Sequence, residues 1–187
     1  LHLVVNCLRN DARGALAIAT ASGADAIRVN VHCGAMATDQ GILEGRAGDT
    51  LRTRRHWNAE RVRIFADVAV KHAVPVADRP LEVDASDLRY RGAADVLLVT
   101  GRATGSAADP AQVQQIRSGA PDAPVVVASG VDLQNAAEWA AIVDGAIVGS
   151  SLMRDGLAGN GVDPDRATRL VEAWQQARQS LQRKVDN

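Results

Sequence analysis

Aromatic side chains are scarce in this chain: three tryptophans, one tyrosine and one phenylalanine make up 3% of its 187 residues. Alanine, valine, leucine and isoleucine must therefore supply most of the core packing. Cysteine is scarce too, since only Cys7 and Cys33 are present and no CxxC pair occurs. These features exclude a disulfide framework, and both cysteines are expected to pack as small apolar residues on neighbouring strands.

An excess of charge is also missing, because the formal net charge at pH 7 is only -1. This balance gives no electrostatic argument for binding nucleic acid or an acidic membrane surface. No run approaches the roughly 18 apolar residues of a membrane span, and no charged-then-apolar signal segment opens the sequence. We therefore expect a cytoplasmic protein with no nucleic-acid partner and no integral membrane segment.

What the chain does contain is a recurring phrase of glycine, one or two small residues, aspartate and an apolar run. It appears in residues 23–27 and 92–97, and a permuted version occupies residues 144–148. A glycine can end a helix in the left-handed conformation, and an apolar run after it fits a buried strand. Repetition of this pattern predicts βα units and a parallel sheet, in a single domain over residues 1–187.

Six strands are expected, at residues 3–7, 26–31, 62–68, 96–100, 125–128 and 146–148. The helices between them are expected to follow Asp11 as far as Gly23, then to span residues 45–57 and 80–91. Further helices are expected to start at Asp109-Pro110 and to span residues 164–184 after Asp163, because an aspartate cap followed by a first-turn proline favours a helix start. Asp132 is expected to cap another short helix.

The spacing of the strands indicates a barrel. Strand starts from Leu3 to Ala146 lie roughly 29 residues apart, so eight units would need about 230 residues, close to a usual (β/α)8 barrel. We therefore expect an α/β fold, a (β/α)8 TIM barrel lacking its first two βα units. The alternative is an open doubly wound sheet, for which six strands would be complete. The absence of a glycine-rich turn after the first strand, where residues 8–11 stand, counts against that alternative.

Polar side chains gather at the expected carboxyl ends of the strands, where parallel α/β folds bind ligands. In the stretch from Ile27 to Gly34, alternation puts Arg28, Asn30 and His32 on one face. An ordinary strand with one wet face would show the same pattern. We predict a site with catalytic roles for Asp67, Lys71 and His32, and with substrate-binding roles for Asn6, Arg28, Asn30 and Thr100. An internal salt bridge between Asp67 and Lys71 is the competing interpretation.

Two short Gly/Ser turns come after the last two strands, Ser129-Gly130 and Gly149-Ser150. Main-chain N–H groups at such turns can bind an anion without a charged side chain, and many barrels hold a substrate phosphate there. We predict that these four residues bind the phosphate of a phosphorylated small molecule. The alternative is that the glycines only permit tight turns.

Other clusters are weaker signals. His32, Asp67 and His72 could surround a metal ion, but no HxH or HExxH spacing supports this, so no metal site is predicted. The cofactor stays unspecified, with Mg²⁺ left open. The arginines at 46, 52, 54 and 55 read as a solvated helix face, or as a surface for an acidic partner. Residues 34–45 form a glycine-punctuated connection that is typical of a lid or ligand loop.

Several motifs resemble the BtpA/SgcQ family. They are residues 8–13 (LRNDAR), 27–32 (IRVNVH), 38–41 (TDQG), 44–47 (EGRA), 65–68 (FADV) with Lys71-His72, 129–131 (SGV), and 148–152 (VGSSL) with 154–156 (RDG). The resemblance implies a TIM barrel of the ribulose-phosphate-binding type whose chain begins about two βα units earlier. It also implies a link to photosystem I assembly or stability, as for photosynthetic members. Other members are described as nucleoside triphosphatases or sugar-metabolism proteins.

Two functions are open as hypotheses. The first is an enzyme that acts on a phosphate ester or sugar phosphate at the strand ends. The second is a non-catalytic assembly or stability factor with a vestigial site. A barrel with exposed strand edges is further expected to pair with a partner, including another copy of itself, or to aggregate.

Overall fold

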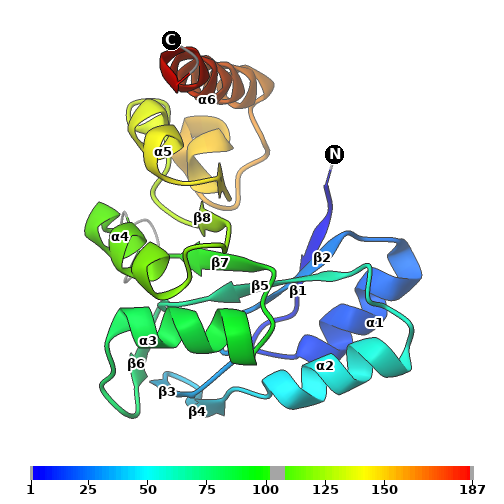
Figure 1. The fold of residues 1–187 in the computed structure, drawn as a ribbon. Helices are drawn as coiled ribbons and strands as arrows, with labels where there is room; N and C mark the ends of the chain where they lie inside the picture. The colour runs from blue at the N-terminus through cyan, green and yellow to red at the C-terminus, as the bar shows by residue number, and fades with distance from the viewer. Residues whose placement is uncertain (1, 102–107, 186–187) are drawn as a thin grey trace.

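A computed structural model describes residues 2–101 and 108–185 of the chain. Its main sheet has six parallel strands, and neighbours in the sheet follow one another along the chain (Figure 1). In this order they are β1 (Val4–Asn6), β2 (Ala26–Val29), β5 (Arg63–Asp67), β7 (Val96–Val99), β8 (Val125–Val127) and β9 (Gly145–Ala146). The sheet curls into a half-barrel with helices outside it.

The helices between these strands start and end close to the predicted positions. They are α1 (Ala12–Ser22), α2 (Ala47–His56), α3 (Leu81–Ser86) with its continuation η1 (Asp87–Arg91), α4 (Pro110–Gly119), α5 (Ala136–Ile142) and α6 (Pro164–Val185), with the short turns η2 (Ser150–Leu152) and η3 (Arg154–Gly156). Asp11 caps α1, because its carboxylate accepts a hydrogen bond from the Gly14 N–H. Gly23 closes the same helix at a φ of 75°, a conformation that favours glycine.

The strand order decides between the two predicted architectures. A doubly wound sheet reverses its strand order at a switch point, whereas here each new strand adds to the same side of the previous one. The barrel prediction is confirmed and the doubly wound alternative is wrong. Within the described residues, β1 and β9 pair with one neighbour each, so both are edges of the sheet.

The connection at residues 34–45, predicted as a lid or ligand loop, is instead an antiparallel hairpin. It consists of β3 (Ala35–Thr38) and β4 (Gly41–Glu44), and β6 (Ala73–Pro75) pairs with the free side of β3. Gly41 has a φ of 97° at the tip, which permits the tight reversal. The small sheet therefore joins the connection after β2 to the connection after β5.

Apolar packing fills both faces of the main sheet. On the outer face Ile27, Val29 and Ile64 pack against α1, through Leu16 and Ala19. On the inner face a second apolar group crosses β5, β7 and β8 and extends to the residues directly after β8 and β9. It consists of Phe65, Val96, Leu98, Val126, Ala128 and Ile147. On the same face Arg28 and Asp67 lie toward the carboxyl ends of β2 and β5.

His32 departs from the predicted alternation. β2 ends at Val29 and residues 30–34 form bends, so the side chains no longer alternate as in a strand. The His32 side chain is 1% exposed, and its Nε2 lies 2.8 Å from the Gly92 carbonyl oxygen at the end of η1. Its Nδ1 is buried without a hydrogen-bond partner in the described part of the chain. His32 therefore packs against the helix layer and does not join Arg28 and Asn30.

The burial of His32 predicts a pH dependence of stability. Burial lowers the pKa of His32 below its ordinary value of 6.5, so folding favours the neutral imidazole. The stability that neutral His32 contributes is present above about pH 6.5 and is lost as the pH falls below it, by up to about 1.4 kcal/mol per pH unit. Urea unfolding at pH 7.5 and 5.5 should show a smaller pH effect in His32→Gln than in the wild type. His56→Gln, at an exposed position, should keep the wild-type effect, and an unchanged effect in His32→Gln would contradict the argument.

Candidate functional site

The polar carboxyl ends of β1, β2 and β5 meet in one hydrogen-bonded cluster. Arg28 donates to both oxygens of Asp67, from Nε and from Nη2, each at 2.9 Å. The Asn30 amide donates to the same carboxylate at 2.8 Å. Asn6 donates to the side-chain oxygen of Asn30 and to the Arg28 carbonyl. Four predicted site residues are thus brought together: Asn6, Arg28, Asn30 and Asp67.

Asp67 is the most buried charged group of this cluster. Burial raises the pKa of its carboxyl above the ordinary value, while the hydrogen bonds and positive charge of Arg28 oppose that rise. The Asp67 side chain is 1% exposed and that of Arg28 is 17% exposed. Removing one partner of such a pair costs about 3–5 kcal/mol, since the other charge stays buried. The competing interpretation of an Asp67–Lys71 salt bridge is therefore wrong, because Asp67 forms its salt bridge with Arg28 and none with Lys71 among the described residues.

Two of the predicted hydroxyl ligands, Thr100 and Ser129, already form hydrogen bonds within the protein. Thr100 Oγ1 donates to the Ala69 carbonyl at 2.6 Å, and Ser129 Oγ accepts from the Gly101 N–H at 2.6 Å. Both side chains are almost fully buried. These hydroxyls link neighbouring strand ends, and Ser129, whose oxygen accepts from Gly101, can still offer its O–H and its main-chain N–H to a ligand.

A hollow of about 890 Å³ opens beside the last two strands. Its walls are the connection from β8 to α5 over residues 128–135, the turn after β9 with the start of η2 over residues 147–151, and side chains of α6. The predicted phosphate residues all line it, namely Ser129, Gly130, Gly149 and Ser150, together with Lys71 from the connection after β5. Ser151 Oγ donates to the Val131 carbonyl at 2.7 Å and ties the two turns together.

Main-chain donors of the two turns have no acceptor among the residues that the structure describes. Among the described residues, none accepts a hydrogen bond from the N–H groups of residues 129–131 or of residues 149–151. The pairing of β8 with β9 ends at Val127 and Ala146, so it does not extend to these two turns. Unpaired N–H groups that line one hollow are a suitable lining for a polyoxygen anion.

Positive side chains border the same hollow. Lys71, Arg166 and Arg169 line it from two sides, whereas Asp132 is the acidic side chain in its lining. The Asp132 carboxylate already accepts from the N–H groups of Gln134 and Asn135. The sequence-based prediction missed both arginines. Their spacing of three along α6 fits one helix face, but nothing in the sequence indicated that this face lies against the turn after β9.

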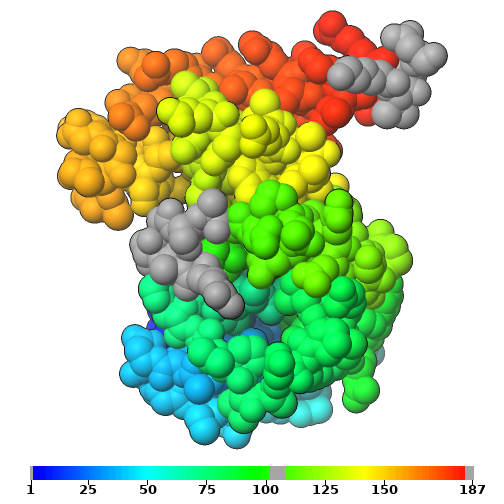
Figure 2. All heavy atoms as spheres, turned by 90° about the vertical axis from the view of Figure 1, so that its left-hand side faces the viewer, coloured from blue at the N-terminus to red at the C-terminus, as the bar shows by residue number. Residues whose placement is uncertain are grey.

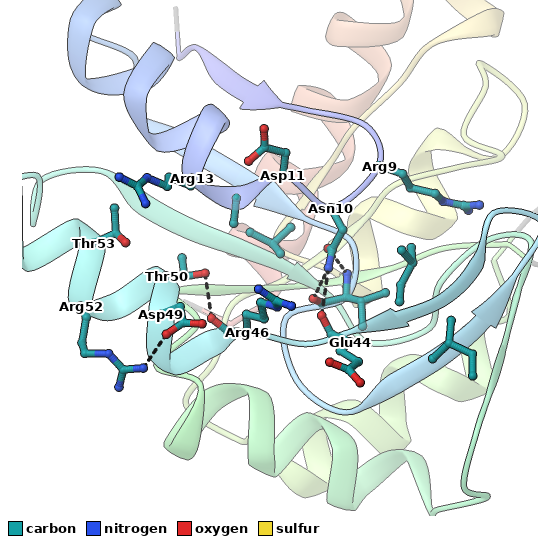
Figure 3. Close-up of a pocket in the computed structure, with 15 residues that line it drawn as sticks. Arg9, Asn10, Asp11, Arg13, Glu44, Arg46, Asp49, Thr50, Arg52 and Thr53 are labelled. Carbon is teal, nitrogen blue, oxygen red and sulfur yellow. Dashed lines mark hydrogen bonds and ion pairs between the residues drawn. The ribbon is translucent and has the colours of Figure 1, made fainter.

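A second hollow, of about 580 Å³, lies between the starts of α1 and α2 on the outer side of β2 (Figure 3). Arginines line it together with acidic residues, and these charges largely compensate each other. Arg52 pairs with Asp49, and Arg9 pairs with Asp39 of the hairpin. Arg13 lies over the Trp57 ring, with 5.7 Å between its guanidinium carbon and the ring centre. Asn10 is fixed by two hydrogen bonds with the main chain of Val31.

Metal-binding clusters and membrane-spanning helices are both absent from the described part of the chain. Residues 2–101 and 108–185 contain no group of three or more His, Cys, Asp or Glu side chains placed to hold a metal ion. The same residues contain no helix that is long and apolar enough to cross a bilayer.

Solved structures with a similar fold include two that are named for phosphorylated compounds. N-(5'-phosphoribosyl)anthranilate isomerase from Pyrococcus furiosus matches with a TM-score of 0.55 at 19% identity, over 92% of this chain and 73% of its own. 3-Hexulose-6-phosphate synthase from Salmonella typhimurium matches with a TM-score of 0.56 at 16% identity, over 94% and 74%. At these identities the likeness concerns the fold alone, which is that of a TIM barrel.

Sequence relatives are much nearer. The photosystem I biogenesis protein BtpA of Synechocystis sp. is 43% identical over 169 residues, which is 90% of this chain and 58% of that protein. An uncharacterized protein of Thermococcus kodakarensis is 43% identical over 180 residues, which is 96% and 67%. The chain thus spans about three fifths to two thirds of the length of these relatives. The family model described as the BtpA family matches residues 1–176, and the chain belongs to this family.

Proposed function

We propose that this protein binds a phosphorylated small molecule in the hollow between the turns after β8 and β9. The observation that carries the proposal is that the N–H groups of residues 129–131 and 149–151 have no acceptor among the described residues, and that their turns line the same hollow as three cationic side chains. A phosphate group offers several acceptor oxygens and up to two negative charges. Charge-assisted hydrogen bonds to such a group are about twice as strong as neutral ones.

The size of the hollow and the fold support a ligand larger than phosphate alone. A volume of about 890 Å³ lies within the range of about 300–1,000 Å³ that small-molecule sites occupy. The two barrels with a similar fold are named for a phosphoribosyl compound and for a hexulose 6-phosphate. We therefore propose a sugar phosphate or a related phosphate ester as the ligand, with enzymatic turnover as the purpose of binding.

The polar cluster supports substrate orientation more directly than proton transfer. Arg28 and Asn30 are both fixed by Asp67, so their remaining donors are held in place at the mouth of the half-barrel. Asp67 itself is enclosed by its partners, and we propose that it positions Arg28 and Asn30. A direct catalytic part for Asp67 stays a prediction. His32, which packs against η1, has no contact with this cluster among the described residues.

A second candidate function rests on a different observation. Ile42, Ala37 and Val74 lie side by side across the small sheet, and Ile42 and Val74 are 66% and 67% exposed. Exposed apolar faces mark protein–protein contacts. Together with the name of the Synechocystis relative, this face supports an assembly or stability factor of photosystem I biogenesis. In that case the hollow need not bind any metabolite.

A thermal-shift panel of sugar phosphates, nucleotides and the matching unphosphorylated sugars tests the proposal. A ligand present at 100 times its Kd should add about 2.7 kcal/mol of stability and raise the Tm by several degrees. Phosphorylated compounds should give a saturable shift, and unphosphorylated sugars should give none. Each compound is tested with and without Mg²⁺, since phosphate ligands often bind as the magnesium complex.

Gly149→Phe provides the blocking variant for this panel. A Cβ at Gly149 would meet no atom within 4 Å, so the ring can enter the hollow without displacing the chain. The variant should lose the shift, and its Tm without ligand is measured as a check of folding, because Gly149 has a φ of −125° and a ψ of −95°, outside the regions that other residues favour. Ala17→Phe on the exposed side of α1 should keep both the Tm and the shift. A folded wild-type protein that responds to no phosphorylated compound would overturn the proposal in favour of the assembly factor.

Removal of the α6 charges should weaken binding of the same ligands. Arg166→Gln and Arg169→Gln each remove a cation from the lining, and a charge-assisted hydrogen bond contributes about 1.5–3 kcal/mol. The Kd of a phosphorylated hit, measured by calorimetry, should rise about 10- to 100-fold in either variant. Arg183→Gln, an exposed arginine of the same helix, serves as the control. Equal affinity in all three variants would exclude the two arginines from the site.

A further inference from the structure

The chain almost never uses lysine. Of its 21 basic residues 19 are arginines, and the two lysines are Lys71 and Lys184, near the end of α6. An arginine can supply positive charge to a phosphate at least as well as a lysine can. A primary amine adds something that a guanidinium does not have, namely a nucleophilic lone pair once the proton is lost. Lys71 is the lysine that lines the proposed ligand hollow.

The surroundings of Lys71 favour an amine that loses its proton easily. Its side chain is partly buried, and among the described carboxylates none forms an ion pair with it. Asp67 is the carboxylate whose charge acts on Lys71, but it already accepts two hydrogen bonds from Arg28. Burial and the charge of Arg28 lower the pKa of Lys71, and the Asp67 charge opposes them. Partial desolvation beside another cation is a recognised way to activate a lysine as a nucleophile.

The geometry places this amine opposite the phosphate-binding turns. Lys71 enters the hollow from the connection after β5, whereas the free N–H groups come from the turns after β8 and β9. A ligand whose phosphate binds those turns would extend its carbon chain across the hollow. The Arg28–Asp67–Asn30 cluster lies on the Lys71 side, where it can bind hydroxyl groups of such a chain.

We propose that the Lys71 amine forms an imine with the carbonyl group of an open-chain aldose or ketose phosphate. The inference rests on the phosphate binding proposed above and names the substrate class of that site. The neutral amine attacks the carbonyl carbon, a C–N bond forms, and the proton of the new ammonium passes to the former carbonyl oxygen. One further proton from solvent releases that oxygen as water and leaves a protonated imine. No oxidant or reductant takes part.

Borohydride trapping tests the proposal. The 187-residue chain is incubated with dihydroxyacetone phosphate or ribose 5-phosphate, treated with sodium borohydride, and examined by intact mass and peptide mapping. The borohydride reduces any imine to a stable secondary amine. We expect one adduct per chain, on Lys71, formed only when sugar phosphate and borohydride are both present.

The second lysine provides a matched control. Lys71→Arg should abolish the adduct and keep the positive charge, while Lys184→Arg should leave it unchanged. At pH 7 Lys71 should react faster than Lys184, because burial and the charge of Arg28 lower the pKa of Lys71 and so raise its neutral fraction. Far-ultraviolet circular dichroism and the Tm of each variant establish that it is folded. Lys71→Met provides a second variant of the same position.

The outcomes separate this inference from the proposed function. Labelling of Lys184 and the terminal amine at the rate of Lys71 would overturn it as unselective glycation. Absence of any Lys71 adduct, in protein that is still stabilised by sugar phosphates in the thermal-shift panel, would overturn the imine and leave phosphate binding intact. Equal labelling of Lys71 by dihydroxyacetone and by its phosphate, unaffected by inorganic phosphate, would support the imine and overturn the phosphate site.

Discussion

The ion pair between Arg28 and Asp67 is the interaction on which the mouth of this half-barrel depends. It joins β2 to β5 where each strand ends, and Asn30 and Asn6 extend it across the sheet to β1. Two charges inside a fold are tolerated only when each satisfies the other. The pair therefore fixes which side chains can face a ligand. It also leaves Lys71 without a carboxylate partner among the described residues, and an amine without such a partner loses its proton more easily.

The architecture could be predicted from the sequence because short sequence patterns mark where its helices and strands begin and end. Asp11 and Gly23 mark the ends of α1, and the repeated glycine–aspartate phrase precedes buried strands, so the number and order of βα units could be inferred. The hairpin at β3 and β4 could not be predicted in the same way. Its strands are four residues long, and pairing with β6, some 30 residues later, stabilises them. Such pairing is a tertiary effect that short-range patterns do not carry.

Prediction of the site succeeded where a strand continues and failed where it stops. Arg28 and Asp67 share a cluster because alternation holds up to the ends of β2 and β5, and Asn30, the first residue after β2, still reaches Asp67. His32 lies just beyond the end of β2, and two bends were enough to turn it toward Gly92. Arg166 and Arg169 were missed for another reason. They belong to α6, and the local sequence does not indicate where this helix packs on the half-barrel.

The docking of α6 has a consequence for affinity. This helix packs on α5 and beside η2, at one end of the molecule (Figures 1 and 2), yet it supplies two of the three cations that border the hollow. Only molecules with α6 in place carry a complete site, so the apparent Kd is the intrinsic value divided by the docked fraction. Any mutation or partner that holds α6 against η2 would then tighten ligand binding without touching the ligand, and one that releases the helix would weaken it.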